Sequence, residues 1–346
     1  MPAKKNTKPA ARPVKVLKKL KNVPFWIGFD LGGTKMMACV LGADYNVLGS
    51  ARKSTNGSEG AGKGRAKIVK AIHEAMEDAG VNPKGLKGIG IGCPGLVDPA
   101  KGVLVTAPNL GWTNVALRKL LQNEFKCAVA VLNDVDAGTY GEYVLGAGRG
   151  ARSLLGVFPG TGVGAGFVYN GQIVMGRGIS AMELGNLLLP GTHIGSPVFG
   201  AVVLEDLTSR LALASQAGVA CYRGQLPDLD KKTEGALRGI RSKALASAFK
   251  GGEDAAMIMF RNSIRYLGMG VAMVVNLLAP DRVTLGGGLV EELPGLYLSL
   301  LKEEVDRYAI PELAKGVKYS LAKLGGQAVA AGAVAWLRNE KEQARA

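Results

Sequence analysis

The chain alternates short apolar runs with longer segments in which apolar residues recur every three to four positions. Short apolar runs are typical of buried strands, whereas the longer spacing is typical of helices that bury one face. The apolar runs predict strands at 25–30, 36–41, 46–51, within 87–95, at 127–132 and at 281–285. The helical spacing predicts helices at 65–79, 114–125, 200–217, 254–279 and 326–339. This alternation of strands and helices indicates an α/β fold.

The segment 152–176 repeats the pattern of the first strands, because it again runs strand, glycine-rich turn, strand, short turn and strand. Gly33 and Gly162 hold equivalent places in the two segments, and Phe29 and Phe158 share the same offset. Self-similarity of this kind indicates duplication. We therefore expect two α/β halves with a cleft between them.

Composition and charge narrow the class of protein. Hydrophobic residues make up 47% of the chain, which excludes a disordered protein. The formal net charge is +15, but residues 1–22 hold eight basic residues and no acid, which leaves +7 for the remainder. We predict that 1–22 is a disordered basic arm, with contact to nucleic acid or another polyanion as the alternative. The arm has no long apolar run, so we expect neither a signal peptide nor a membrane anchor.

Cysteine and histidine are scarce. The four cysteines lie far apart and the only histidines are His73 and His193, which argues against a Cys-x-x-Cys zinc site and most histidine chemistry. Dispersed cysteines are also typical of a reducing compartment. No uncharged apolar stretch approaches the roughly 18 residues of a membrane span. We expect a cytoplasmic protein that does not enter a membrane.

Glycine supplies 50 of 346 residues, about twice its usual share of roughly 7%. Three clusters follow predicted strands. Without a Cβ, glycine lets backbone N–H groups approach phosphate oxygens closely. A tight hairpin is the alternative for each cluster, but three in this order favour a nucleotide site. The candidate residues are Gly32, Gly33, Thr34 and Lys35 in the first, Gly160, Thr161, Gly162 and Gly164 in the second, and Gly286, Gly287 and Gly288 in the third.

Two carboxylates at strand ends are candidates for chemistry. Asp30 precedes the first glycine turn and is placed to hold a magnesium ion or its waters. Asp134 follows Asn133 at the end of another strand, where a carboxylate is poised to accept a hydroxyl proton during phosphoryl transfer. Asn133 would orient the same substrate. A helix N-cap is the alternative for this Asn-Asp pair.

Taken together, the motifs DLGGTK, GIGCPGLVD, APNLGW, LNDVDAGTYGE, PGTGVGAG and LGGGL resemble those of the ROK family of sugar kinases and repressors. The resemblance spans about residues 25–338. It implies an actin-like, hexokinase-type ATPase fold that binds ATP with Mg²⁺. It also implies that Asp134 is the catalytic base and that sugar hydroxyls are held by Asn109, Asn133, Asp134, Glu183 and Glu205, with Asn186 as a further candidate where the family has a histidine. For Glu183 and Glu205, a plain helix-surface glutamate is the alternative.

The chain departs from the family pattern at its zinc motif. The positions of the four metal ligands carry Asn186, Ser196, Val198 and Val203. Serine and valine are not useful zinc ligands, so we predict no zinc. The nearby His193 is expected to be an ordinary surface or core residue. Asn186 both donates and accepts hydrogen bonds, so a hexose can still bind with altered preference.

The resemblance implies an N-terminal α/β domain at 23–133, a larger α/β domain at 134–325 and a C-terminal helix at 326–346 that returns to the first domain. We expect an ATP-dependent hexose kinase, foremost a glucokinase, that forms a homodimer. One alternative is a non-catalytic sugar-responsive regulator, although the helix-turn-helix domain of such repressors is not expected here. Others are a kinase for another hexose or N-acetylhexosamine, or one that takes its phosphoryl group from polyphosphate.

Overall fold

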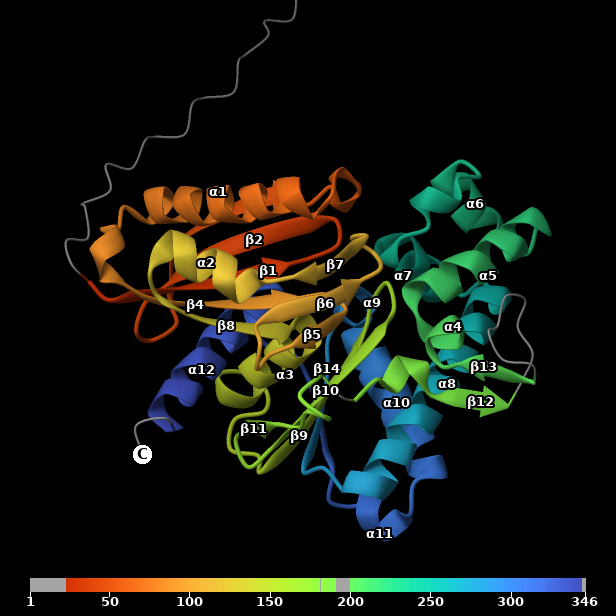
Figure 1. Cartoon of the computed structure of the whole chain (residues 1–346). Coiled ribbons are helices and arrows are strands. Elements are labelled where there is room, and N and C mark those ends of the chain that lie inside the picture. Colours follow the sequence, from red (N-terminus) through yellow and green to blue (C-terminus); the bar gives the residue numbers. More distant parts are fainter. Residues whose placement is uncertain (1–22, 181, 191–199, 344–346) are drawn as a thin grey trace, which may run out of the picture.

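The structure is a computed structural model that describes residues 23–180, 182–190 and 200–343. The predicted basic arm at 1–22 and the positions His193, Ser196 and Val198 lie outside the described residues. Two five-stranded sheets form the frame of the molecule (Figure 1).

The first sheet has the order β3-β2-β1-β4-β8. Its central strand β1 pairs antiparallel with β2 and parallel with β4, which in turn pairs parallel with β8. Phe25, Ile27, Phe29 and Leu31 alternate along β1 and therefore share one of its faces, and all four are fully buried. The strands are β1 (Phe25–Leu31), β2 (Lys35–Leu41), β3 (Val47–Ser54), β4 (Leu86–Cys93) and β8 (Ala128–Asn133).

The second sheet repeats this arrangement with the order β11-β10-β9-β14-β15. Its strand β9 pairs antiparallel with β10 and parallel with β14, and β14 pairs parallel with β15. The predicted duplication is therefore confirmed. The strands are β9 (Ser153–Pro159), β10 (Val163–Tyr169), β11 (Gln172–Ile173), β14 (Arg282–Leu285) and β15 (Lys318–Leu321).

Helices cover both faces of the first sheet. Helix α1 (Ala61–Ala79) packs on β2 and β3, and α2 (Leu117–Phe125) packs on β8. Helix α12 (Ala328–Gln343) packs on β1 and β4 from the side opposite α1 (Figure 1).

Helix α3 (Asp134–Val144) lies between the sheets, where it contacts α12 on one side and β10 on the other. The α3–α12 crossing is very close. A Cβ on Gly332 would clash with the carbonyl oxygen of Ala137 and lie 2.6 Å from the Gly141 nitrogen.

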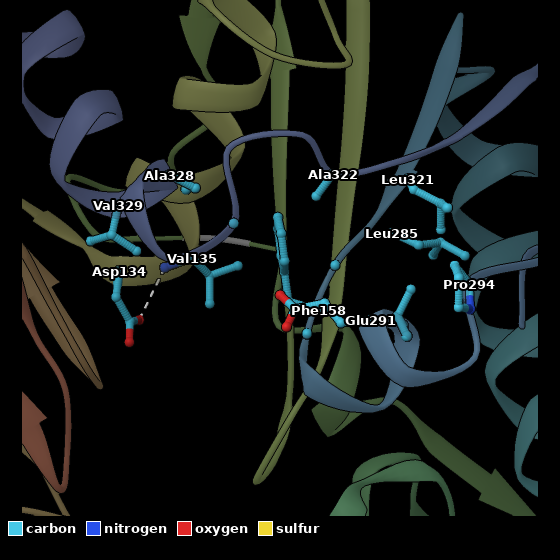
Figure 2. Close-up of a pocket in the computed structure, with 15 residues that line it drawn as sticks. Asp134, Val135, Phe158, Leu285, Glu291, Pro294, Leu321, Ala322, Ala328 and Val329 are labelled. Carbon is cyan, nitrogen blue, oxygen red and sulfur yellow. Dashed lines mark hydrogen bonds between the residues drawn. The ribbon is translucent and has the colours of Figure 1, made fainter. Parts of the chain in front are cut away.

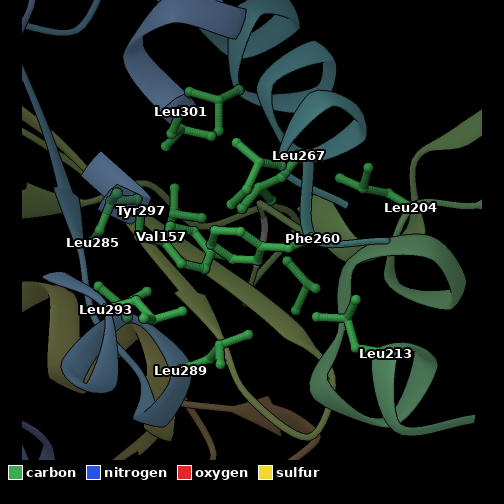
Figure 3. Packing of buried hydrophobic residues seen from close by; sticks show 14 of the residues in the cluster. Val157, Leu204, Leu213, Phe260, Leu267, Leu285, Leu289, Leu293, Tyr297 and Leu301 are labelled. Atoms are coloured by element: carbon green, nitrogen blue, oxygen red, sulfur yellow. The ribbon is translucent and has the colours of Figure 1, made fainter. Parts of the chain in front are cut away.

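The largest core lies beside the second sheet. Phe260 and Leu267 from α8 (Asp254–Leu278) and Tyr297 from α10 (Pro294–Tyr308) pack toward Val157 and Leu285 of the sheet (Figure 3). The remaining helices of this half are α4 (Glu205–Thr208), α5 (Arg210–Tyr222), α6 (Pro227–Thr233), α7 (Ser242–Gly251), α9 (Gly288–Glu292) and α11 (Pro311–Ala314). In the described residues, no helix is long and apolar enough to cross a membrane.

Two small sheets account for the places where the predicted elements differ. The helix predicted from 114 begins at Leu117, because β7 (Trp112–Val115) pairs with β6 and gives those residues partners in a strand. The single helix predicted at 200–217 is a strand, β13 (Ala201–Val203), followed by α4 and α5. The break falls at Ser209, which is extended and whose hydroxyl caps α5 by accepting a bond from the Ala212 N–H. The other strands are β5 (Leu96–Asp98), β6 (Val103–Ala107) and β12 (Leu188–Pro190).

Candidate active site

Asp134 stands at the junction between the two sheets, because β8 ends at Asn133 and α3 begins with Asp134. The Asn133 Oδ1 accepts hydrogen bonds from the backbone N–H of Val135, at 2.8 Å, and of Asp136, at 3.1 Å. Its Nδ2 donates to the Gly95 carbonyl oxygen at 3.0 Å. Asn133 is thus the N-cap of α3, the alternative that the sequence left open, and it fixes the backbone that carries Asp134. Its contact with a sugar remains a prediction.

The surroundings of Asp134 favour its protonated form more than water does. Burial raises its pKa to about 7, and the negative charge of Asp30 acts in the same direction. The backbone N–H of Val135 donates to Asp134 Oδ1 at 3.0 Å and opposes the shift (Figure 2). A carboxylate whose pKa lies near neutral pH is suited to accept a proton in a reaction.

Asp30 is a second half-buried carboxylate near Asp134, at the end of β1. Burial raises its pKa to about 6, and the positive charge of Arg52 opposes that shift. Carboxylate oxygens are the ligands that Mg²⁺ prefers in proteins, and a cation here would favour the charged forms of both carboxylates. The two residues therefore fit a magnesium ion that Asp30 would hold.

The first glycine turn joins β1 to β2, so the hairpin alternative is present. The Thr55 hydroxyl donates to the Gly32 carbonyl oxygen at 2.7 Å, and the Thr55 N–H donates to that of Thr34 at 2.9 Å. Thr34 and Lys35 are exposed. Asn109 lies beside this turn, since its Nδ2 is 3.2 Å from the position of a Cβ on Gly33. Thr55, which holds the turn in place, was not identified from the sequence.

The second turn joins β9 to β10 and is braced from two sides. The Thr161 hydroxyl accepts a bond from the Arg210 guanidinium at 3.2 Å, and Glu205 accepts one from the Val163 N–H at 3.1 Å. A Cβ on Gly162 would lie only 2.5 Å from the Glu205 carboxylate, so a larger residue there would displace this side chain from its bond to Val163. Glu205 therefore accepts a hydrogen bond from the second glycine turn. Its contact with a sugar stays a prediction. Gly160 and Gly164 belong to the same hairpin.

The third turn opens onto an elongated pocket of about 370 Å³. Gly286 and Gly287 line the pocket, and Gly287 has a φ of 104°, which only glycine adopts easily. Figure 2 shows Asp134 at one end and the apolar side chains of Leu321 and Pro294 at the other. A mostly apolar pocket of this size, with Asp134 at one end and Glu291 in its wall, fits the base and ribose of a nucleotide.

A further polar group gathers around α3. Asn186 donates to Glu183 at 3.0 Å, and both side chains are exposed. The hydroxyl of Ser180 donates to Asp136, which is buried. Burial raises the pKa of Asp136 to about 7, with the Ser180 bond opposing and the charge of Glu183 reinforcing the shift. The predicted site residues Glu183 and Asn186 therefore lie together. Asp136 belongs to the same polar group, although it was not identified as a candidate from the sequence. Its position two residues after Asp134 was the signal that could have identified it.

Glu142, at the C-terminal end of α3, is fully buried and ties three chain segments together. One oxygen accepts from the Ala147 N–H at 2.8 Å, and the other accepts from Lys323 at 2.8 Å and Leu324 at 2.7 Å. Leu321 and Gly325, on either side of Lys323 and Leu324, line the pocket. Glu142 thus positions one pocket wall, a role that no local sequence pattern signals.

In the described residues, no group of three or more His, Cys, Asp or Glu side chains is placed to hold a metal. The predicted loss of the zinc site concerns partly the segment outside those residues, and it stays a prediction.

Two sheets with the same strand arrangement, and a nucleotide-sized pocket that α3, α12 and the second sheet line with a carboxylate at its end, define the class of actin-like ATPase folds to which hexokinases belong. Within that class, the chain belongs to the ROK family, whose family model matches residues 26–340.

Relatives in this family include enzymes and regulators. The glucokinase of Halalkalibacterium halodurans is 30% identical over 321 residues, which cover 92% of this chain and 96% of that protein. The xylose repressor of Caldicellulosiruptor bescii is 27% identical over 333 residues, covering 95% of this chain and 82% of the repressor. A crystal structure of the ROK family glucokinase from Streptomyces griseus, in complex with glucose and AMPPNP, matches with a TM-score of 0.77 and 28% identity, over 91% of this chain and 99% of that one.

Proposed function

We propose that this protein is an ATP-dependent hexose kinase that converts glucose to glucose 6-phosphate. The observation that carries the proposal is the place of Asp134, a half-buried carboxylate with a pKa raised to about 7, at the end of the nucleotide-sized pocket and at the junction of the two sheets. The glucose and ATP-analogue complex of the Streptomyces griseus relative supports this choice of substrates.

In the proposed reaction, Asp134 accepts the proton of a sugar hydroxyl as that oxygen attacks the γ-phosphorus of ATP. The turns at Gly32–Thr34 and Gly160–Gly162 would hold the phosphates through backbone N–H groups, and the apolar pocket would hold the adenosine. Asp30 would hold a magnesium ion, which would supply positive charge to neutralise the phosphate oxygens. Glu183, Asn186 and Asn109 would bind the other hydroxyls and set the orientation of the sugar.

The decisive experiment replaces the proposed base. Asp134→Asn keeps the shape of the side chain and removes its capacity to take a proton, so we expect glucose-dependent ADP formation to fall at least about a thousandfold. Nucleotide affinity, measured by calorimetry, should change little. The matched control is Asp254→Asn, an exposed aspartate on α8. Retained turnover in Asp134→Asn would refute the assignment of the base.

The choice of sugar is tested separately with glucose, mannose, fructose, N-acetylglucosamine and N-acetylmannosamine as acceptors. The highest kcat/KM is expected for glucose. The repressor relative supports a second candidate function, that of a sugar-responsive regulator. Salt-sensitive, sequence-specific DNA binding together with an absence of turnover on every sugar would favour the regulator.

A further inference from the structure

Glu183 is presented by a tight turn whose backbone is strained. Its φ of −71° and ψ of 61° are those of an inverse γ-turn, which the Leu184 N–H closes by donating to the Met182 carbonyl oxygen at 2.7 Å. Met182 has a φ of 63°, in the left-handed region, which a residue with a Cβ adopts only at a cost in free energy. A turn of this kind persists where contacts on both sides hold the chain in place.

The contact that follows Glu183 is the packing of the short 3-10 helix η3 (Leu184–Asn186) on β10. Leu184 is buried in the largest core. A Cβ on Gly185 would lie 2.4 Å from the Val163 carbonyl oxygen, so the backbone of η3 lies directly against the strand. The chain after Glu183 is therefore fixed to the second sheet.

The contact that precedes Glu183 is a side-chain hydrogen bond to α3. Ser180 closes a short hairpin by pairing with Met175. From the end of this hairpin, the Ser180 hydroxyl donates to Asp136 Oδ2. Among the described residues, this is the side-chain hydrogen bond that joins the hairpin to α3.

The carboxylate of Asp136 depends on this hydroxyl. Asp136 is only 1% exposed, and its Oδ1 has no hydrogen-bond partner in the part of the chain that the structure describes. A buried polar group without a hydrogen bond is costly, so the bond from Ser180 contributes more than a similar bond at the surface would. The charge of Glu183 acts on the pKa of Asp136, so the two carboxyl groups lie near each other.

The first turn of α3 serves both the proposed base and this bond. Asp134 begins the helix, and the Asn133 Oδ1 accepts from the backbone N–H of Asp136 at 3.1 Å. The backbone that carries Asp134 therefore also holds the chain that leads to Glu183. Because a displacement of about 1 Å is enough to alter binding and rate strongly, a common support for the two carboxylates matters for function.

We propose that Ser180 is a positioning residue of the acceptor site, whose bond to Asp136 keeps Glu183 where it can hold a hydroxyl of the hexose. Without the hydroxyl, the chain before Met182 loses its support and the strained turn relaxes. The inference rests on the proposed function, because Ser180 acts through the Glu183 of that same site. No local pattern marks the bond, since 44 residues separate its two partners.

The test removes the hydroxyl alone. Ser180→Ala is compared with the parent and with Ser180→Thr, which keeps a hydroxyl. The matched control is Ser299→Ala, because Ser299 is an exposed serine of α10 whose hydroxyl also donates a hydrogen bond. Steady-state kinetics give the KM for glucose and for ATP, and calorimetry gives the Kd for glucose in the absence of nucleotide.

We expect Ser180→Ala to raise the KM and the Kd for glucose about tenfold, because Glu183 leaves its position. The KM for ATP should change by less than about twofold, since the residues that would bind the nucleotide lie on other segments. Ser180→Thr should return both glucose constants to within about threefold of the parent values. Ser299→Ala should match the parent.

A double variant separates positioning from a general loss of structure. If Ser180 acts through Glu183, then Ser180→Ala in a Glu183→Gln background should raise the Kd for glucose by less than about threefold. Two substitutions that act on independent parts of the molecule would instead multiply their effects.

Each other outcome decides the question. Glucose constants that stay unchanged in Ser180→Ala overturn the inference, and so does an equal rise in the KM for ATP. The same rise in the parent and Glu183→Gln backgrounds overturns the action through Glu183. A KM for glucose as high in Ser180→Thr as in Ser180→Ala overturns the role of the hydroxyl. All these results leave the proposed function intact, whereas a parent that forms no glucose 6-phosphate refutes it.

Discussion

The buried carboxylate of Glu142 offers the sharpest test of how the pocket is held together. Glu142→Gln preserves the volume of the side chain but replaces one acceptor oxygen with an NH₂ group. The carbonyl oxygen of the glutamine can face either the Lys323 and Leu324 N–H groups or that of Ala147. In both orientations, at least one buried N–H faces another donor.

The magnitude follows from the three bonds. A hydrogen bond to a charged group contributes about 1.5–3 kcal/mol, whereas one between neutral groups contributes about 1 kcal/mol. Two bonds weaken to the neutral value and the third leaves a buried N–H unsatisfied, which costs about 1–3 kcal/mol. Relief from burying a charge offsets part of this loss. We expect the free energy of unfolding to fall by about 3 kcal/mol.

The assay is denaturant unfolding of the parent and the variant, together with the KM for ATP. The substitution weakens the bonds that hold Lys323 and Leu324, and the neighbouring residues Leu321 and Gly325 line the pocket. We therefore expect the KM for ATP to rise about fivefold. Glu303→Gln is the control, because this exposed glutamate pairs only with exposed groups and should change stability by less than about 0.5 kcal/mol. A stability loss below about 1 kcal/mol in Glu142→Gln would refute the reasoning.

Three further predictions concern titration and packing. Asp30→Asn removes a negative charge that raises the pKa of Asp134. The acid limb of the pH profile of kcat/KM, expected near pH 7, should therefore move to lower pH, while kcat falls. An acid limb at the same pH in parent and variant would contradict this coupling. Because the folded-state pKa of Asp136 is raised from 3.8 to about 7, the folded chain binds more protons than the unfolded chain between these values, and stability falls as pH rises through that window. Asp136→Asn should remove this pH dependence, which thermal unfolding at pH 5 and pH 8 would reveal; equal slopes in parent and variant would count against it. Gly332→Ala should cost about 1–3 kcal/mol of unfolding free energy through its contacts in the α3–α12 crossing, whereas Gly295→Ala, in an open position of α10, should be neutral or stabilising.

Sequence patterns predicted the strands well because each reads as a short apolar run. The apolar run predicted as a strand at 25–30 forms β1, in which five of seven residues are buried. The helix predicted at 254–279 is α8. The hydrophobic pattern did not predict short elements whose structure depends on contacts with other segments of the chain. Strand β7 exists only because β6 pairs with it, and Ser209 divides a segment that is apolar on both sides.

The candidate site divides in the same way. Asp30 and Asp134 lie at strand ends of one sheet, where neighbouring strands bring their ends together, so local motifs were sufficient to propose both as candidates. Glu142 and Thr55 act through backbone groups at distant positions, and no local spacing marks such bonds.

The close crossing of α3 and α12 also constrains how the molecule can move. Gly141 and Gly332 let the two helix backbones approach closely, so we expect any change of angle between the two halves to turn about this contact. Asp134 lies seven residues from Gly141 along α3, a distance of about 10 Å along the helix axis. Because Asp134 lies close to this contact, a turning motion would displace the proposed proton acceptor less than parts of the molecule farther from the crossing.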